Sequence, residues 1–175
     1  DAATFQELPL YYIEFHWSKD KNFIYWNENK QTYLDPVSTK IYPYFIVDKT
    51  AVWILINNQI KQIDMDPLTF AYLGYGHVKD SKNVYFTDGN SIQKIEGAYA
   101  PSLTLLIPDR QDENFERDGY AINIYTKDKN RVFHQGEIIP GADTSSFTIV
   151  DSVYQKDKNH VYFRGAVIPD SDPNT

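Results

Sequence analysis

The feature that most constrains the fold is an internal repeat of about thirty residues. A short turn followed by a β-branched and aromatic run recurs as K-D-K-N-F-I-Y-W from Lys19, K-D-S-K-N-V-Y-F from Lys79, K-D-K-N-R-V-F from Lys127 and K-D-K-N-H-V-Y-F from Lys156. A weaker copy, D-K-T-A-V-W, starts at Asp48. One such repeat buries too little apolar surface to fold alone, so the copies must pack against one another.

A second signature marks where each repeat begins. It reads D-A-A-T-F at Asp1, D-P-V-S-T at Asp35, D-P-L-T-F at Asp66, Y-A-P-S-L at Tyr99, D-T-S-S-F at Asp143 and D-P-N-T at Asp172. We therefore expect five repeats over residues 1–34, 35–65, 66–98, 99–142 and 143–171, within a single β-repeat domain spanning residues 1–175. The segment 172–175 then starts a sixth repeat, an interpretation under which the native polypeptide would continue.

Each repeat reads as three short strands. In the fifth repeat the first strand covers residues 147–153, with a shift of phase before Val153, and ends at the Asp-Lys-Asn turn. The second strand is the V-Y-F run at 161–163, whose alternation sends neighbouring side chains to opposite faces. The Arg-Gly pair at 164–165 is typical of a tight hairpin turn and leads into a brief third strand at 166–168.

The composition favours an all-β fold. Aromatic residues make up 15% of the chain, led by 14 Tyr and 10 Phe, and these residue types prefer strands. No segment has a sustained apolar period of 3.6, so helix should be limited to single turns at the links that begin each repeat. Five three-stranded meanders predict a propeller-like arrangement, a curved array of hairpins or a β-solenoid, and we favour the propeller-like arrangement because it protects strand edges.

Charge and residue types exclude several classes of function. The formal net charge is −7, whereas nucleic-acid binding requires clustered Lys and Arg, so we expect no nucleic-acid partner. Without Cys the chain has no disulfide, thiolate zinc site or cysteine nucleophile. No stretch approaches the roughly 18 apolar residues of a membrane-spanning helix, and we expect none. The chain begins at Asp1 rather than Met, which a removed export signal or a cloning boundary would explain; we expect export.

The turn motif also resembles a known family. Asp-Lys-Asn at 20–22, 128–130 and 157–159, each followed within a few positions by an aromatic residue, is similar to the signature of the DKNYY family. The copy at 48–50 departs from it, with Thr50 in place of Asn. The resemblance implies a bacterial tandem-repeat protein that is exported, periplasmic or lipid-anchored in the envelope. It implies no activity, because the family is largely uncharacterised.

The strongest departure from the repeat is an insertion in the fourth copy. The distance to the turn Asp is 15 residues from Phe5, 10 from Phe70 and from Phe147, and 25 from Leu103. The extra residues lie at 108–122, and loops this long in compact domains are usually functional or disordered. Its charged and aromatic residues suit an interface with a protein partner, and the candidate partner-binding residues are Arg110, Asp112, Glu113, Phe115, Glu116, Arg117, Asp118 and Tyr120. The alternative is a variable surface loop or an extended hairpin whose Phe115 folds back on the scaffold.

Aromatic residues also crowd the segment 8–17. Exposed Tyr and Trp rings could stack on sugars, but Tyr11, Phe15 and Trp17 have the period of two that a half-buried strand requires. We favour core packing for this segment.

Catalytic and metal-binding patterns are weak. His16, His77, His134 and His160 fall at different positions in their repeats, and no H-E-x-x-H, G-x-S-x-G or phosphate-binding glycine loop is present. Two carboxylate pairs, Asp64 with Asp66 and Asp170 with Asp172, have a spacing seen in calcium sites, but turn capping is the better explanation. We therefore expect no catalytic residue, no metal and no cofactor.

Together these features predict a non-enzymatic protein-binding module of the bacterial envelope. Its most specific form is an immunity or inhibitor protein that blocks a secreted toxin or enzyme through the inserted loop 108–122. The alternative is carbohydrate or cell-wall binding through exposed Tyr and Trp residues.

Overall fold

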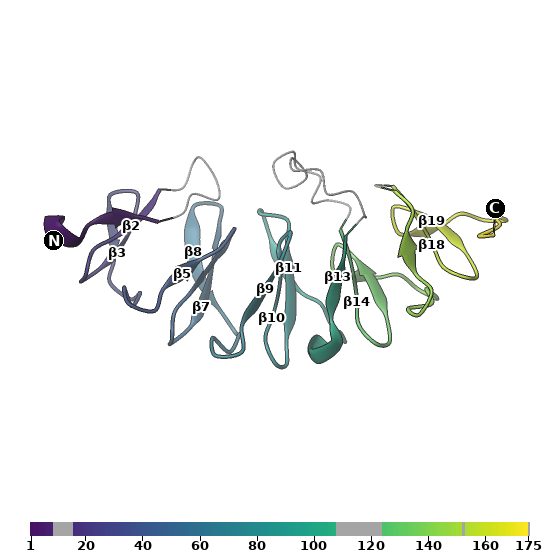
Figure 1. Ribbon diagram of the computed structural model, residues 1–175, viewed down its shortest axis with the longest axis horizontal. Coiled ribbons are helices and arrows are strands. Elements are labelled where there is room, and N and C mark those ends of the chain that lie inside the picture. The colour runs from purple at the N-terminus through teal and green to yellow at the C-terminus, as the bar shows by residue number, and fades with distance from the viewer. Residues whose placement is uncertain (9–15, 108–123, 152, 175) are drawn as a thin grey trace. The chain divides into compact units, whose positions relative to one another are not determined.

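The computed structural model describes residues 1–8, 16–107, 124–151 and 153–174 (Figure 1). These residues form twenty strands and two short 3-10 helices, with no α-helix among them. Every strand belongs to one of five antiparallel sheets of four strands each. The expected all-β class is therefore confirmed.

The chain divides into two compact bodies, Asp1–Phe70 and Ala71–Thr175. The N-terminal body begins with helix η1 (Ala2–Thr4) and has two sheets. The first consists of β1 (Gln6–Glu7), β2 (Trp17–Lys19), β3 (Ile24–Trp26) and β4 (Asn29–Gln31). The second consists of β5 (Lys40–Ile41), β6 (Phe45–Val47), β7 (Val52–Ile56) and β8 (Gln59–Ile63).

The C-terminal body has three sheets, and each follows chain order. The first consists of β9 (Ala71–Gly74), β10 (His77–Lys79), β11 (Val84–Thr87) and β12 (Ile92–Lys94). Helix η2 (Ala100–Ser102) leads into the second, formed by β13 (Thr104–Leu106), β14 (Tyr125–Lys127), β15 (Val132–His134) and β16 (Glu137–Ile138). The third consists of β17 (Thr148–Ile149), β18 (Tyr154–Lys156), β19 (Val161–Phe163) and β20 (Ala166–Val167).

The tight turns between the third and fourth strands follow from their residues. Gln135-Gly136 has φ angles of 50° and 82°, and Arg164-Gly165 has 49° and 80°. Two successive positive φ angles define the turn that matches the twist of an antiparallel hairpin, and glycine adopts this conformation at the lowest cost. These angles confirm the hairpin expected at Arg164-Gly165 and show the same turn at Gln135-Gly136.

The expectation of three strands per repeat is wrong, because each sheet has four. The segment 147–153, expected to be one strand, contains β17 and a reversal, and the chain returns as β18 with Ile149 opposite Gln155. Asp151 drives the reversal, since its Oδ1 accepts the amide hydrogens of Val153 and Tyr154 at 2.8 and 2.7 Å. The shift of phase in the sequence therefore marks a turn.

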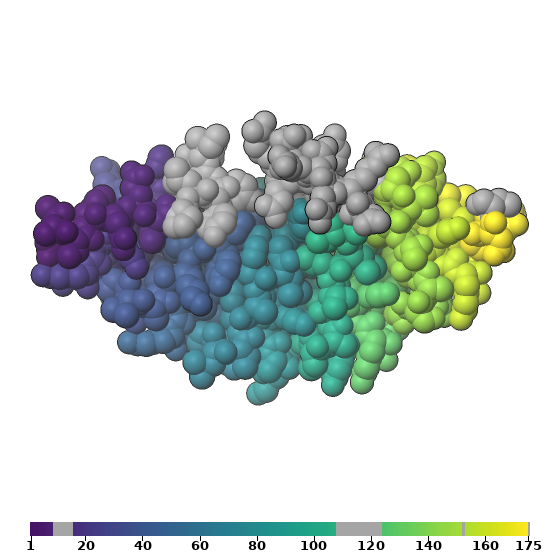
Figure 2. Space-filling view, viewed as in Figure 1, coloured from purple at the N-terminus to yellow at the C-terminus, as the bar shows by residue number. Residues whose placement is uncertain are grey.

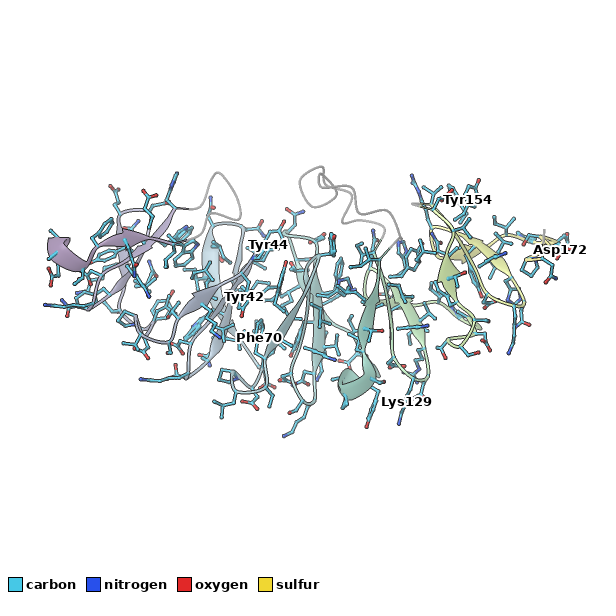
Figure 3. The ribbon with its side chains drawn as sticks, viewed as in Figure 1. Tyr42, Tyr44, Phe70, Lys129, Tyr154 and Asp172 are labelled. Atoms are coloured by element: carbon cyan, nitrogen blue, oxygen red, sulfur yellow. The ribbon has the colours of Figure 1, made fainter. Side chains whose placement is uncertain are left out.

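The core of each body lies between successive sheets. In the N-terminal body Trp17 and Ile24 of the first sheet pack with Trp53 of the second. The ring of Phe70 contacts that of Tyr42, with centroids 5.6 Å apart (Figure 3). A single repeat has no core of its own, so its folding depends on its neighbour.

The described residues of the C-terminal body form two such cores. One joins the first sheet to the second through Val84, Phe86, Ile95, Ala100, Leu103 and Phe133. The other joins the second sheet to the third through Tyr125, Val132, Ile139, Phe147 and Tyr162. In the space-filling view, the side chains of neighbouring sheets in this body are in contact (Figure 2). The propeller-like or curved arrangement of the repeats, and their union in one domain, stay predictions.

Candidate functional site

The aspartate of the Asp-Lys-Asn turn is a buried structural residue. Asp157 is 3% exposed, and its Oδ1 accepts the amide hydrogens of Asn159 and His160 at 2.7 and 2.8 Å. Its Oδ2 accepts the amide hydrogen of Asp143 at 2.8 Å and the hydroxyl hydrogen of Tyr162 at 2.7 Å. Burial alone would raise the pKa of Asp157, but these hydrogen bonds outweigh it and lower the pKa below its usual value.

The same carboxylate joins the turn to the start of its own repeat in other copies. Oδ2 of Asp48 accepts the amide hydrogen of Asp35 at 3.0 Å, and Oδ2 of Asp128 accepts that of Tyr99 at 2.7 Å. Asp20 receives the terminal ammonium group of the first residue. The aspartate therefore closes each of these repeats on itself.

The lysine after this aspartate reinforces the closure. Lys158 pairs with Asp143 at 2.8 Å, and Lys49 pairs with Asp35 at 2.9 Å. The hydroxyl of Ser38 and the charge of Lys49 lower the pKa of Asp35 to about 2. The fourth repeat begins with tyrosine, and there Lys129 places its Nζ 4.0 Å from the ring centroid of Tyr99, a cation–π contact (Figure 3).

The lysine before the aspartate reaches forward to the next repeat. Lys127 Nζ donates to the carbonyl oxygen of Thr144 at 3.0 Å, and Lys79 Nζ donates to that of Leu103 at 2.9 Å. Lys19 makes the equivalent bond to Pro36 at 3.5 Å. The K-D-K motif thus combines a bond to the following repeat with two bonds inside its own.

This arrangement accounts for the sequence signature in physical terms. The DKNYY family model matches residues 125–175. The expected resemblance is confirmed for this part of the chain. Comparisons with curated proteins and with solved structures found no match.

In the C-terminal body the turn between β14 and β15 lies at one edge, and the ends of β13 and β14 that flank residues 108–123 lie at the opposite edge. Lys129 marks the first edge and Tyr154 the second (Figure 3). Strands β13 and β14 pair without interruption, from Thr104 opposite Lys127 to Leu106 opposite Tyr125. The corresponding hairpin of the third repeat, between β9 and β10, closes through only Tyr75 and Gly76.

The predicted partner-binding residues fall outside the described residues. They are Arg110, Asp112, Glu113, Phe115, Glu116, Arg117, Asp118 and Tyr120, all within 108–123. The described residues that flank this segment differ in burial: Ile107 is 51% exposed, whereas Ile124 is 1% exposed. The described residue that follows the insertion is therefore part of the buried interior.

The aromatic N-terminal segment is described only at its ends. Leu8 packs on the core, and Trp17 is 4% exposed, with its ring stacked 6.1 Å from that of Trp26. Core packing is confirmed for Trp17. Tyr11 and Phe15 lie outside the described residues.

Comparison of equivalent positions in the repeats reveals an exposed cluster that reading the sequence alone missed. Tyr154 and Phe163 are 41% and 42% exposed, and their rings lie 5.4 Å apart. The guanidinium carbon of Arg164 lies 5.4 Å from the ring centroid of Phe163. The equivalents of Tyr154 and Phe163 in the fourth repeat are Tyr125 and His134, so the residue types alone do not distinguish the exposed Tyr154 from the buried Tyr125.

Histidines and carboxylates have packing and capping roles. The ring of His77 lies against that of Phe86 with centroids 4.7 Å apart, and the ring of His134 stacks on that of Tyr125 with centroids 4.5 Å apart. Asp66 accepts the amide hydrogen of Leu68 at 3.0 Å and the hydroxyl hydrogen of Thr69 at 2.8 Å, which confirms its turn-capping role. Asp172 likewise accepts the amide hydrogen of Asn174 at 2.9 Å.

The described residues contain neither a metal-binding cluster nor a membrane-spanning helix. Outside the gaps at 9–15, 108–123, 152 and 175, no three His, Cys, Asp or Glu side chains gather in a way that could hold a metal ion. Over the same part of the chain, no helix has the length and apolar character needed to cross a bilayer.

Buried His77 should make stability depend on pH. Desolvation lowers the pKa of His77 to about 4, against 6.5 when it is unfolded, while its Nδ1 donates to the carbonyl oxygen of Tyr75. Below pH 6.5 the unfolded chain takes up a proton that the folded protein does not, so stability falls until pH reaches about 4. We expect a loss of about 2 kcal/mol between pH 7 and pH 5 from this residue.

The measurement is urea unfolding at both pH values for the wild type and His77→Phe. The phenylalanine variant keeps an aromatic ring beside Phe86 and should lack this component of the pH dependence. Identical pH dependence in the two proteins would contradict the assignment.

Proposed function

We propose that the protein is a non-enzymatic protein-binding module and that the inserted loop 108–122 contacts its partner. One observation carries the proposal: the insertion leaves a hairpin whose strands β13 and β14 stay in register up to Leu106 and Tyr125. The scaffold does not need the extra residues, since the third repeat closes the same hairpin with two. An insertion that folding does not require is free to evolve for binding.

The repeats supply a rigid base for such a loop. The buried DKNYY aspartate closes the fourth repeat on itself, through Asp128 and the amide of Tyr99. Lys127 then fixes this repeat to the next through the carbonyl of Thr144. A preorganised base supports affinity because less conformational freedom is lost on binding.

The most specific form of the proposal is an immunity or inhibitor protein of the bacterial envelope. Its net charge of −7 suits a basic partner, and electrostatic attraction would accelerate their association. A propeller-like or curved array of repeats would present the loop at one edge. A secreted toxin or enzyme whose cleft accepts the loop is the partner that we propose.

The decisive experiment removes the loop from the full chain. Deletion of residues 109–121 should abolish retention of the partner when the purified protein is used as bait in an extract of the source cell. The captured protein is then purified and titrated calorimetrically against both chains. Thermal unfolding of the deletion variant should stay close to that of the wild type, because five residues would still link Leu106 to Tyr125, whereas the third repeat closes the same hairpin with two.

Point variants separate the loop's chemistry from its length. Phe115→Ala and Arg117→Ala should each weaken binding by roughly tenfold or more, because aromatic and Arg residues carry most interface energy. Glu137→Ala is the matched control, since Glu137 is exposed on β16 of the same sheet. Unchanged affinity after deletion of the loop would refute the proposal.

Carbohydrate or cell-wall binding remains the alternative proposal, with a narrower choice of residues. Trp17 and Trp53 are buried, so the candidates for ring stacking among the described residues are exposed tyrosines such as Tyr99 or Tyr154. A peptidoglycan pull-down distinguishes the two proposals. Retention that survives loop deletion but is lost in Tyr154→Ala would favour the carbohydrate reading.

A further inference from the structure

The outward face of the last sheet, β17–β20, reproduces a surface that the preceding sheet buries. The fourth and fifth repeats align without gaps from β14 and β18 onward. In this alignment Tyr154 corresponds to Tyr125, Val161 to Val132, and Ile168 to Ile139. The two sheets therefore present the same kind of apolar face towards the repeat that follows.

In the fourth repeat that face is covered. Tyr125 and Val132 are fully buried, and Ile139 is 5% exposed. They pack against Phe147 and Tyr162 of the fifth repeat. The fifth repeat therefore covers the repeat before it with two aromatic residues. One lies in its link and the other in its third strand.

In the fifth repeat each equivalent residue is more exposed than its counterpart in the fourth repeat. Tyr154 is 41% exposed, and Val161 and Ile168 are half-buried. Terminal repeats of tandem arrays normally carry a polar outer face. This face is apolar, and so it has the character of an internal interface.

The backbone next to this face already has the conformation of a link. Lys156 Nζ donates to the carbonyl oxygen of Pro173 at 2.9 Å, as Lys127 donates to Thr144 at 3.0 Å. Asp172 Oδ1 accepts the amide hydrogen of Asn174 at 2.9 Å, matching the turn in which Asp35 caps the second repeat. Asp172 lies beside the last sheet in Figure 3.

We propose that the outward face of β17–β20 is a docking face for a sixth unit of the same repeat, whose link is formed by Asp172–Asn174. This unit would place a link aromatic and a third-strand aromatic against Tyr154, Val161 and Ile168. It would thus continue the interface between the fourth and fifth repeats. The face is separate from the inserted loop, and the proposal does not depend on what that loop binds.

The test supplies such a unit. In an extended chain, a copy of residues 143–171 follows Ser171 in place of residues 172–175. Hydrogen exchange at the backbone amides of β18 and β19 should slow by about tenfold or more, because local opening would then require the new interface to break. The midpoint of thermal unfolding should rise.

A matched control keeps the length of the extended chain and removes the contact. It carries Asp at the two positions of the appended copy that correspond to Phe147 and Tyr162. Exchange in this chain should equal that of the original protein. Equal exchange in all three chains would overturn the proposal.

A second measurement tests whether a second copy of the chain binds to the outward face of β17–β20. Sedimentation of the original chain should show a monomer at micromolar concentration. Dimers that Tyr154→Asp converts to monomers would assign the face to a second copy of the chain and so overturn the proposal.

Discussion

Replacing Asp157 with alanine should lower the free energy of unfolding by about 3–5 kcal/mol. The change removes the acceptor of four hydrogen bonds, donated by the amides of Asn159, His160 and Asp143 and by the hydroxyl of Tyr162. The Tyr162 side chain is fully buried, so its hydroxyl would lose its partner away from water. Urea unfolding monitored by circular dichroism measures the loss.

Asp88 is the matched control for Asp157. Its Oδ1 also accepts two turn amides, those of Asn90 and Ser91 at 2.9 and 2.8 Å, but the residue is exposed. Asp88→Ala should therefore cost at most about 1 kcal/mol, the usual value of one exposed turn interaction. Equal losses in the two variants would show that the turn alone, without the closure to Asp143, accounts for the stability.

The second large effect is expected at Tyr125, which connects the fourth and fifth repeats. Its ring packs against Phe147 with centroids 5.8 Å apart, and its hydroxyl donates to Gln155 Oε1 at 2.6 Å. Tyr125→Ala should cost about 3–5 kcal/mol, because it leaves a cavity between two sheets. Tyr125→Phe should cost about 1–2 kcal/mol, since it leaves only the buried Gln155 acceptor unsatisfied.

Tyr154 is the natural control for Tyr125, because it occupies the same position in the fifth repeat and is 41% exposed. Tyr154→Ala should cost about 1 kcal/mol or less in the original chain. Calorimetric unfolding of the three variants measures the ranking. A cost at Tyr154 equal to that at Tyr125 would contradict the view that cores form only between successive sheets.

Much of the fold could be predicted from the sequence, because the same turn and strand patterns occur in several copies of the repeat. Pairs such as Arg164-Gly165 require positive φ angles, and the turns occur where they were expected. The reversal at Asp151 could not be recognised in the sequence, because a phase shift within a strand and a turn between two strands interrupt the alternation of apolar residues in the same way. The capping bonds of Asp151 explain the turn once the backbone is known.

The candidate site could be predicted less completely. The length anomaly located the insertion at 108–122, since spacing can be counted directly in a repeat. The role of Lys127 could not be predicted, because its acceptor is a backbone carbonyl in the next repeat and depends on how two repeats pack. The exposure of Tyr154 likewise depends on what lies beside its sheet, and no local pattern encodes that.

The forward bond of the lysine also has a consequence for how such chains diversify. Lys127 and Lys156 each donate a hydrogen bond to a backbone carbonyl oxygen, and the two acceptor residues are Thr144 and Pro173. This carbonyl oxygen is present whatever side chain the acceptor residue carries. A mutation can therefore change the acceptor residue of one repeat without removing the hydrogen bond that it receives from the preceding repeat. Gene duplication or deletion can change the number of repeats by whole units, and the lysine could form the same hydrogen bond at each new junction.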